Sequence, residues 1–164
     1  MAGGIQVVET VRTVDLKRDG DGLLQLLDHY ARDPMGGGKP LSADVKQNLI
    51  PQLQSRSDYL GVIAFHEAQP VGLINAFEGF STFAAKPLMN IHDVIVSEEC
   101  RGNGLAQRMM EKVEEAARER GCCKLTLEVL SNNLVAQAAY RKYGFGSYTL
   151  DPAAGVAEFW EKTL

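Results

Sequence analysis

The middle of the chain carries the most regular pattern of apolar and polar positions. An apolar run at residues 94–96 predicts the end of a strand, and a short polar stretch follows it. After a glycine-bearing segment, apolar residues recur one helical turn apart from Leu105 to Ala117, and Gly121 stands where a helix commonly ends. The pattern therefore predicts a strand, a glycine-bearing turn and a helix, in that order.

The remaining pattern predicts a mixed α/β fold in one domain. The expected order is a strand, two helices, three strands, then helix, strand, helix and two strands. Asp19 or Asp21 is expected to cap the first helix and Ser42 the second, in which Pro51 suggests a break or kink. Besides the central helix, helices are predicted over residues 19–32, 42–53 and 133–143, and strands over residues 5–11, 59–66, 71–77, 88–96, 124–130, 145–150 and 158–164.

Connections between these elements follow from turn residues. Residues 34–40 contain three glycines and two prolines and predict a flexible loop. Residues 67–70 predict a hairpin, and Gly79 predicts a bulge or bend if the following strand continues to Phe83. The apolar strand over residues 88–96 is expected to be buried on both faces, as a central strand is.

The segment that starts the central helix has a chemical use. The first N–H groups of a helix have no partner within the helix, and the helix dipole adds positive charge there, so this end can hold a phosphate. Glycines let the backbone approach a ligand, and Arg101 adds a positive charge. The alternative is a surface turn that needs glycine only for its dihedral angles. Neither a Walker loop nor the dinucleotide-binding glycine spacing is present.

A second segment, about thirty residues further on, carries another motif that helps to interpret the first. Arg101, Gly104 and Ala106 match the pattern Arg/Gln-x-x-Gly-x-Gly/Ala. The second segment matches Asn-x-x-Ala-x-x-x-Tyr-x-x-x-Gly-Phe at Asn133, Ala136, Tyr140, Gly144 and Phe145. With both motifs in this order, the chain resembles the GNAT superfamily of acyl-CoA-dependent N-acetyltransferases.

That resemblance implies a central mixed sheet, flanked by helices, that splays open after the strand preceding the glycine segment. It also implies acetyl transfer from acetyl-CoA to a primary amine, with the pantetheine arm paired to the free strand edge and the pyrophosphate on the backbone N–H groups of the turn. A metal is not expected. The residues expected to bind acetyl-CoA are Val94, Ile95, Val96, Arg101, Gly102, Asn103, Gly104, Leu105, Ala106, Asn133, Ala136 and Tyr140. Asn133 has the alternative of serving only as a helix cap.

Two residues are the candidates for proton transfer. Tyr140, as the resemblance implies, would protonate the departing thiolate; its alternative is a core aromatic on an amphipathic helix. Asp93 is the candidate base, because a charge within an apolar run is costly unless it is paired. The alternative is that Asp93 is a buried structural carboxylate whose charge is paired, for example with His92. Glu78 and Glu128 compete for the role of base, and the histidines are expected to be structural or exposed.

The acceptor amine is expected between the first two helices, as the resemblance implies. Tyr30, Asp33 and Glu78 are the residues expected to line this site, and Asp28 is a further acidic candidate. The glycine-rich loop suggests closure over the substrate. The sequence does not identify the amine.

Composition narrows the classes of function. The 164 residues suit one domain, residues 1–164, and the net charge of −4 argues against nucleic-acid binding. There is no apolar stretch of membrane-spanning length, no visible signal peptide and no Cys/His cluster with metal spacing. The three cysteines, two of them adjacent, do not form a disulfide framework, which favours a cytoplasmic protein. They are expected to be packing residues. Phe159 and Trp160 on the closing strand are expected either to form the interface of a homodimer or to belong to the core.

Three functions remain compatible with the sequence. The first is an N-acetyltransferase that acts on a small or amino-acid-like amine, with a protein amine as an open variant. The second is a module that binds acyl-CoA without turnover, as a sensor or docking domain. The third is an enzyme that uses a longer acyl-CoA, which depends on the width of the splay.

Overall fold

A computed structural model describes residues 9–148 and 151–164. The chain forms two compact units, Met1–Thr126 and Leu127–Leu164, and each is described by itself. Residues 5–8 of the first predicted strand, and residues 149–150 of the sixth, lie outside the described residues.

The order of elements confirms the predicted mixed α/β class. In the first unit, the helices are α1 (Leu16–Arg32), α2 (Ala43–Gln54) and α3 (Leu105–Glu119), with short 3-10 turns at Pro34–Gly36 and Glu98–Cys100. The strands are β1 (Glu9–Thr13), β2 (Tyr59–His66), β3 (Gln69–Ser81), β4 (Lys86–Val96) and β5 (Leu125–Leu127), the last of which ends in the second unit. The second unit also has α4 (Leu134–Tyr143) and a 3-10 turn at Pro152–Ala154.

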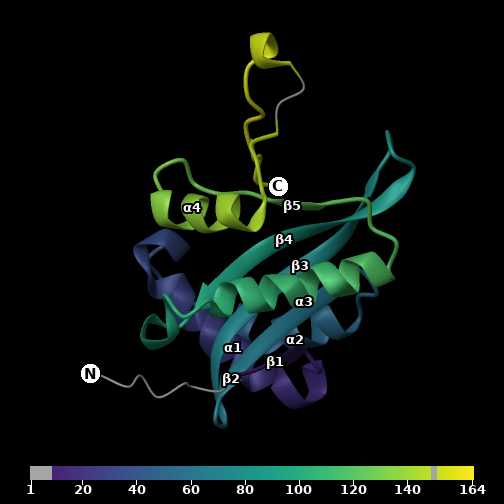
Figure 1. Ribbon diagram of the computed structural model, residues 1–164. Coiled ribbons are helices and arrows are strands. Elements are labelled where there is room, and N and C mark those ends of the chain that lie inside the picture. Colours follow the sequence, from purple (N-terminus) through teal and green to yellow (C-terminus); the bar gives the residue numbers. More distant parts are fainter. Residues whose placement is uncertain (1–8, 149–150) are drawn as a thin grey trace. The chain divides into compact units, whose positions relative to one another are not determined.

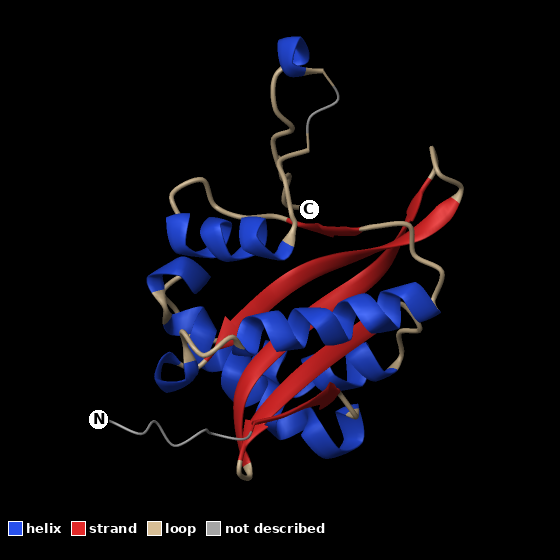
Figure 2. Cartoon of the chain, viewed as in Figure 1, coloured by secondary structure: helices blue, strands red, loops and turns tan. Residues whose placement is uncertain are grey.

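The strands form one sheet in the order β1-β2-β3-β4-β5, and β1 to β4 are antiparallel. Figure 2 shows β3 and β4 as a long hairpin that extends beyond the helices. Of the bulge or bend predicted at Gly79, no bulge is formed, because Gly79 lies in regular register opposite Leu88. The irregularity is instead between Asn75 and Ala76, which pair with Asp93 and Ile91 respectively. The bulge therefore places an extra residue, His92, in β4 beside the candidate base.

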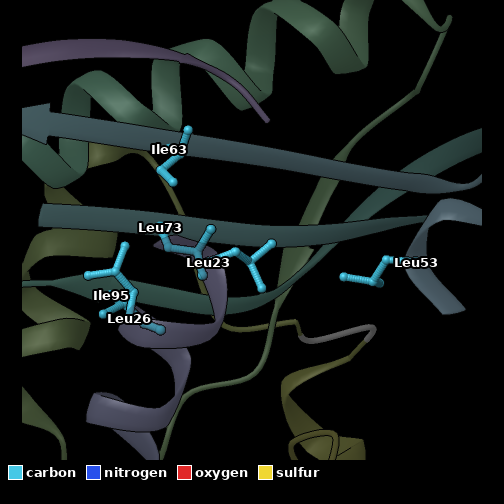
Figure 3. Packing of buried hydrophobic residues seen from close by; sticks show 6 residues of the cluster. All are labelled: Leu23, Leu26, Leu53, Ile63, Leu73 and Ile95. Carbon is cyan, nitrogen blue, oxygen red and sulfur yellow. The ribbon is translucent and has the colours of Figure 1, made fainter. Parts of the chain in front are cut away.

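Helices cover both faces of this sheet within the first unit (Figure 1). On the face covered by α1 and α2, Leu23, Leu26 and Leu53 form a buried cluster with strand residues Ile63, Leu73 and Ile95 (Figure 3). On the other face, α3 packs so closely that a Cβ at Gly72 would lie 2.8 Å from the sulfur of Met109. Burial of apolar side chains on both faces is the main stabilising term. The second half of β4 is only partly covered, so its predicted burial on both faces is wrong.

The helix ends differ from expectation in two places. Asp15 caps α1, and its side chain accepts a hydrogen bond from the Lys17 N–H. Asp19 lies inside the helix and is buried, so neither predicted cap of this helix is correct. Ser42 caps α2 as predicted, but Pro51 does not break that helix, which continues to Gln54.

The second unit is described by α4 and by extended chain. Residues 145–148 and 158–164 are not strands, so the two predicted closing strands are wrong for the part of the chain that the structure describes. A strand needs a neighbour to satisfy its backbone, and no pairing is formed at these residues. Phe159 and Trp160 are exposed there. None of the described helices is long and apolar enough to cross a membrane.

Candidate active site

The segment that starts α3 has the backbone of an anion-binding turn. Gly102 and Gly104 have φ angles of +78° and +76°, which only glycine adopts at little cost, and a Cβ at either would meet nothing within 4 Å. Gly104 is the N-cap, and among the described residues no side chain caps this helix. α1, α2 and α4 are capped by the side chains of Asp15, Ser42 and Asn133, so α3 differs from them in offering its first N–H groups to a ligand.

The side chains around this turn differ in their contacts and exposure. The Arg101 Nε–H donates to the Val96 carbonyl at 3.0 Å, which ties the turn to the end of β4. Its guanidinium also lies 3.9 Å from Glu98, a loose and exposed pair. Leu105 is buried in the core, so only its N–H can face a ligand, whereas Asn103 is exposed. The predicted binding segment is therefore built mainly from backbone.

The end of β4 lies next to this turn. Residues 94–96 pair with Gly72, Leu73 and Ile74 of β3, and the Ser97 N–H donates to the Val71 carbonyl at 2.8 Å. On its other side, β4 bonds to the chain before β5 near its start, through Met89 N–H to Lys124 carbonyl (3.0 Å) and Cys123 N–H to Pro87 carbonyl (2.8 Å). β3 thus pairs with β4 along its whole length, whereas the bonds to the chain before β5 lie near the start of β4. Pairing of pantetheine along residues 94–96 remains a prediction.

Asp93 is paired, but not with His92. One carboxylate oxygen accepts a hydrogen bond from the Asn75 amide at 3.0 Å, and the oxygen of that amide accepts one from the Tyr59 hydroxyl at 2.9 Å. The His92 ring instead packs edge-on against Phe77, with the ring centroids 4.9 Å apart. Asp93 is half-buried, so it combines a fixed orientation with access to a substrate.

The end of α1 carries a phenol, Tyr30, and the residue after this helix is a second carboxylate, Asp33. The Asp33 side chain accepts from the Met35 N–H at 2.8 Å. The Tyr30 hydroxyl donates weakly to the Met35 carbonyl at 3.4 Å. Burial raises the pKa of Tyr30, and the charges of Asp93 and Asp33 raise it further. Tyr30 thus lies within electrostatic reach of both carboxylates, as expected for residues that line one site.

Asp28 does not fit the role of an amine-binding carboxylate. It accepts hydrogen bonds from the Leu41 N–H (2.8 Å) and Arg32 (3.0 Å), and it forms an ion pair with Lys46 (3.0 Å). These partners lower the pKa of Asp28 to about 2, and Lys46 has the largest effect. Its partners come from α1, the loop and α2, so Asp28 serves to hold the loop.

Glu78 is also engaged by a cation of the protein. Its carboxylate lies 3.5 Å from Arg120, whose guanidinium also donates to the Tyr59 carbonyl at 3.2 Å. A carboxylate paired in this way is a weaker candidate for binding or deprotonating an amine than Asp93. His29 and Glu128, two of the other candidates considered for proton transfer, are exposed.

In the second unit, the residues of the second motif determine where α4 begins and ends. The Asn133 side chain accepts from the Ala136 N–H at 3.1 Å and so caps α4. Gly144 ends that helix with φ of +114°, and the Phe145 N–H donates to the Tyr140 carbonyl at 2.9 Å. The Phe145 ring then packs edge-on against the half-buried Tyr140, 6.0 Å between centroids. The motif therefore fixes the two ends of the helix that carries Tyr140.

Other features of the described residues lie apart from these candidates. A cavity of about 590 Å³ opens between β1, the start of α1 and the β2–β3 turn, and none of its lining residues is a predicted site residue. Its polar lining includes Arg12, Arg18, Asp19 and Gln25. Cys100 is buried but Cys123 is exposed, so the packing interpretation holds for the former and is wrong for the latter.

Sequence reasoning missed Tyr59 and Asn75. Asn75 is a polar residue within the apolar run from Val71 to Phe77, and it is only 4% exposed. The cost of burying an amide was a signal that a partner exists. The partner itself depends on strand register, which the sequence does not supply.

Comparisons with known proteins agree with this geometry. Streptothricin acetyltransferase from Streptomyces lavendulae is 37% identical over 82 residues, which are 50% of this chain and 43% of that protein. Thialysine N-epsilon-acetyltransferase from Bos taurus is 34% identical over 65 residues, 40% of this chain and 38% of that protein. The match thus spans less than half the length of each of these two relatives.

Structure and family comparisons cover more of the chain. The crystal structure of an aminoglycoside N-acetyltransferase in complex with CoA superposes with a TM-score of 0.75 over 96% of each chain, at 16% identity, which shows a shared fold. A sequence model of the acetyltransferase (GNAT) family matches residues 23–145, which include both motifs and Asp93. The chain therefore belongs to the acetyltransferase (GNAT) family.

Proposed function

We propose that this protein transfers an acetyl group from acetyl-CoA to a primary amine of a small molecule or an amino-acid-like acceptor. The turn before α3 is the observation that carries the proposal. Its two left-handed glycines and uncapped helix start offer N–H groups to a pyrophosphate, and the space beside both glycines is open, with nothing within 4 Å of an added Cβ. Bound there, acetyl-CoA supplies an activated acyl group as a thioester.

Asp93 is the proposed base. A free alkylamine has a pKa near ~10.4, so about one molecule in a thousand is neutral and nucleophilic at physiological pH. Asp93 would take the proton that the amine loses as its nitrogen bonds to the acyl carbon. The carbon–sulfur bond then breaks, and Tyr140 would give its proton to the departing thiolate. Starting from the neutral amine, one proton passes from nitrogen to Asp93 and one from Tyr140 to sulfur, so atoms and charge balance, and both groups then exchange protons with solvent before the next turnover.

The substrate class rests on chemistry and on the relatives. Asp93 and Asp33, with the phenol of Tyr30 in electrostatic reach, make a face suited to a cationic amine. Relatives named for streptothricin and thialysine support a small molecule rather than a protein amine. Exposed Phe159 and Trp160 support a homodimer as a further part of the proposal.

Acetyl-CoA is expected to raise the melting temperature of the purified protein. A ligand that binds only the folded state adds about 2.7 kcal/mol of stability at a hundred times its Kd. Gly104→Val should remove this shift, because a β-branched side chain is strained at φ of +76° and would project over the turn. Differential scanning fluorimetry measures the shift, and a thiol-release screen over amines measures turnover.

Gly121→Val is the matched control for that variant. Gly121 ends α3 with φ of +74° and open space around it, so the same strain is placed at the opposite end of the same helix. This variant should keep the acetyl-CoA shift. Absence of a shift in the wild-type protein would overturn the proposal, and a shift without turnover of any amine would favour a module that binds acyl-CoA without catalysis.

Tyr140→Phe is expected to lower kcat by about 100-fold, the scale of a lost general acid, while the Kd for acetyl-CoA stays unchanged. The ring and its contact with Phe145 are retained, so α4 should remain intact. Steady-state kinetics and calorimetric titration separate the two effects. Tyr143→Phe, which removes a hydroxyl from a ring stacked on the same Phe145, is the control; equal losses in both variants would remove Tyr140 from the mechanism.

A further inference from the structure

Three polar side chains form a row across three neighbouring strands, β2, β3 and β4. The Tyr59 hydroxyl donates to the Asn75 side-chain oxygen at 2.9 Å, and the Asn75 amide donates to Asp93 at 3.0 Å. Asn75 is 4% exposed, and it lies between Ile74 and Ala76, which are both completely buried. Burying an amide in such a place is costly unless both of its ends are bonded, as they are here.

The hydrogen bonds in this row run in one direction. Burial, and then the charge of Asp93, raise the pKa of Tyr59 well above its usual range, so the hydroxyl keeps its proton and donates. That bond occupies the oxygen end of the Asn75 amide and turns its NH₂ end toward Asp93. The row therefore ends on a carboxylate that acts as acceptor, with one orientation of the amide and one of the carboxyl group.

The backbone is shaped to make this row possible. A Cβ at position 61 would lie 2.2 Å from the Tyr59 hydroxyl, so only glycine leaves room for the phenol to lie along β2 toward Asn75. On the far side, the irregularity between Asn75 and Ala76 sets Asp93 directly opposite Asn75. Bulges of this kind redirect side chains near active sites.

We infer that Tyr59 and Asn75 are positioning residues, which hold the Asp93 carboxylate in the orientation that accepts the proton of the acceptor amine. The inference rests on the proposed function and adds to it two residues that contact neither acetyl-CoA nor the reacting atoms. Asn75 binds one oxygen of the Asp93 carboxylate, and in this inference the other oxygen accepts the proton of the amine. Pre-orientation of a catalytic group lowers the barrier because its alignment need not be repeated in each turnover.

The test is a set of double variants. Tyr59→Phe and Asn75→Leu should each lower kcat by about fivefold to tenfold, the scale of one hydrogen bond, with the KM for acetyl-CoA unchanged. The same two substitutions made in an Asp93→Asn background should have almost no further effect, because the group on which they act is gone. Tyr148→Phe, which removes a hydroxyl from an exposed tyrosine, is the matched control.

Each outcome has a separate meaning. Losses that vanish in the Asp93→Asn background support the inference. Losses of the same size in both backgrounds would show that Tyr59 and Asn75 merely stabilise the sheet, and would overturn it while the proposed function stands. A wild-type protein that binds no acetyl-CoA and acetylates no amine would overturn the proposed function and this inference with it. The melting-temperature shift with acetyl-CoA establishes that each variant is folded.

Discussion

Replacing Asp19 by alanine is expected to lower the free energy of unfolding by about 3 kcal/mol, at the low end of the cost of breaking a buried ion pair because the Arg12 side chain is 29% exposed. The Asp19 carboxylate is 2% exposed and receives two bonds from Arg12, at 2.6 and 2.8 Å, and one from the Asp15 N–H at 2.8 Å. Alanine would leave that guanidinium and that N–H without their acceptor. The melting temperature should fall by roughly 6–12 °C, measured by calorimetry.

Asp21→Ala is the matched control, two residues along the same helix. Asp21 is exposed, and alanine favours a helix at least as much as aspartate does, so its stability should change by less than about 0.5 kcal/mol. The double variant Arg12→Met/Asp19→Leu should recover part of the loss, since it removes both charges. A loss below about 1 kcal/mol for Asp19→Ala would show that the pair contributes little.

The pH dependence of the same variant gives a second measurement. The Arg12 hydrogen bonds, as the largest cause, hold the pKa of Asp19 well below its usual value of 3.8. A carboxyl with a lowered pKa in the folded state adds stability that is complete above its unfolded pKa and is lost as the pH falls. The difference between the wild type and Asp19→Ala should therefore be constant from pH 5 to 8 and shrink below about pH 4.

The turn before α3 could be predicted from sequence because its determinants are local. Two glycines, an arginine and a helical repeat within about twenty residues specify the strand end, the turn and the helix, and the structure places them as predicted. The caps at Ser42 and Asn133 are local in the same sense. Each depends on backbone dihedral angles and on hydrogen bonds that span three residues.

What could not be predicted depends on contacts between distant segments. Tyr59 reaches Asn75 across 16 positions of sequence, and Asn75 reaches Asp93 across 18, so both bonds follow from strand register. Aspartate is a residue type that commonly caps helices, but Asp19 lies inside α1, where its carboxylate binds Arg12 of β1. Glu78 and Asp28 are acidic residues that could bind an amine, but in the fold they form ion pairs with Arg120 and Lys46. A polar residue within an apolar segment of the sequence indicates that it needs a hydrogen-bond partner. The identity of that partner depends on the fold.

Asp93→Asn is expected to lower kcat by about 1,000-fold, within the range found for a lost general base, without changing the Kd for acetyl-CoA. The substitution is nearly isosteric, and the side-chain oxygen of the new amide can still accept from Asn75, so the row of hydrogen bonds and the fold should persist. What is lost is the group that takes a proton from the amine. Stopped-flow or steady-state thiol release at saturating amine measures kcat directly.

Two further variants decide whether the loss belongs to Asp93 itself. Asp21→Asn makes the same chemical change on the exposed side of α1 and should leave kcat within about twofold of the wild type. Glu78→Gln tests the competing base: its carboxylate is engaged by Arg120, so its loss should lower kcat far less than the loss of Asp93. If Glu78→Gln proved the more damaging variant, the proton would have to leave on the Arg120 side of β3. The row formed by Tyr59, Asn75 and Asp93 would then position a binding group rather than a base.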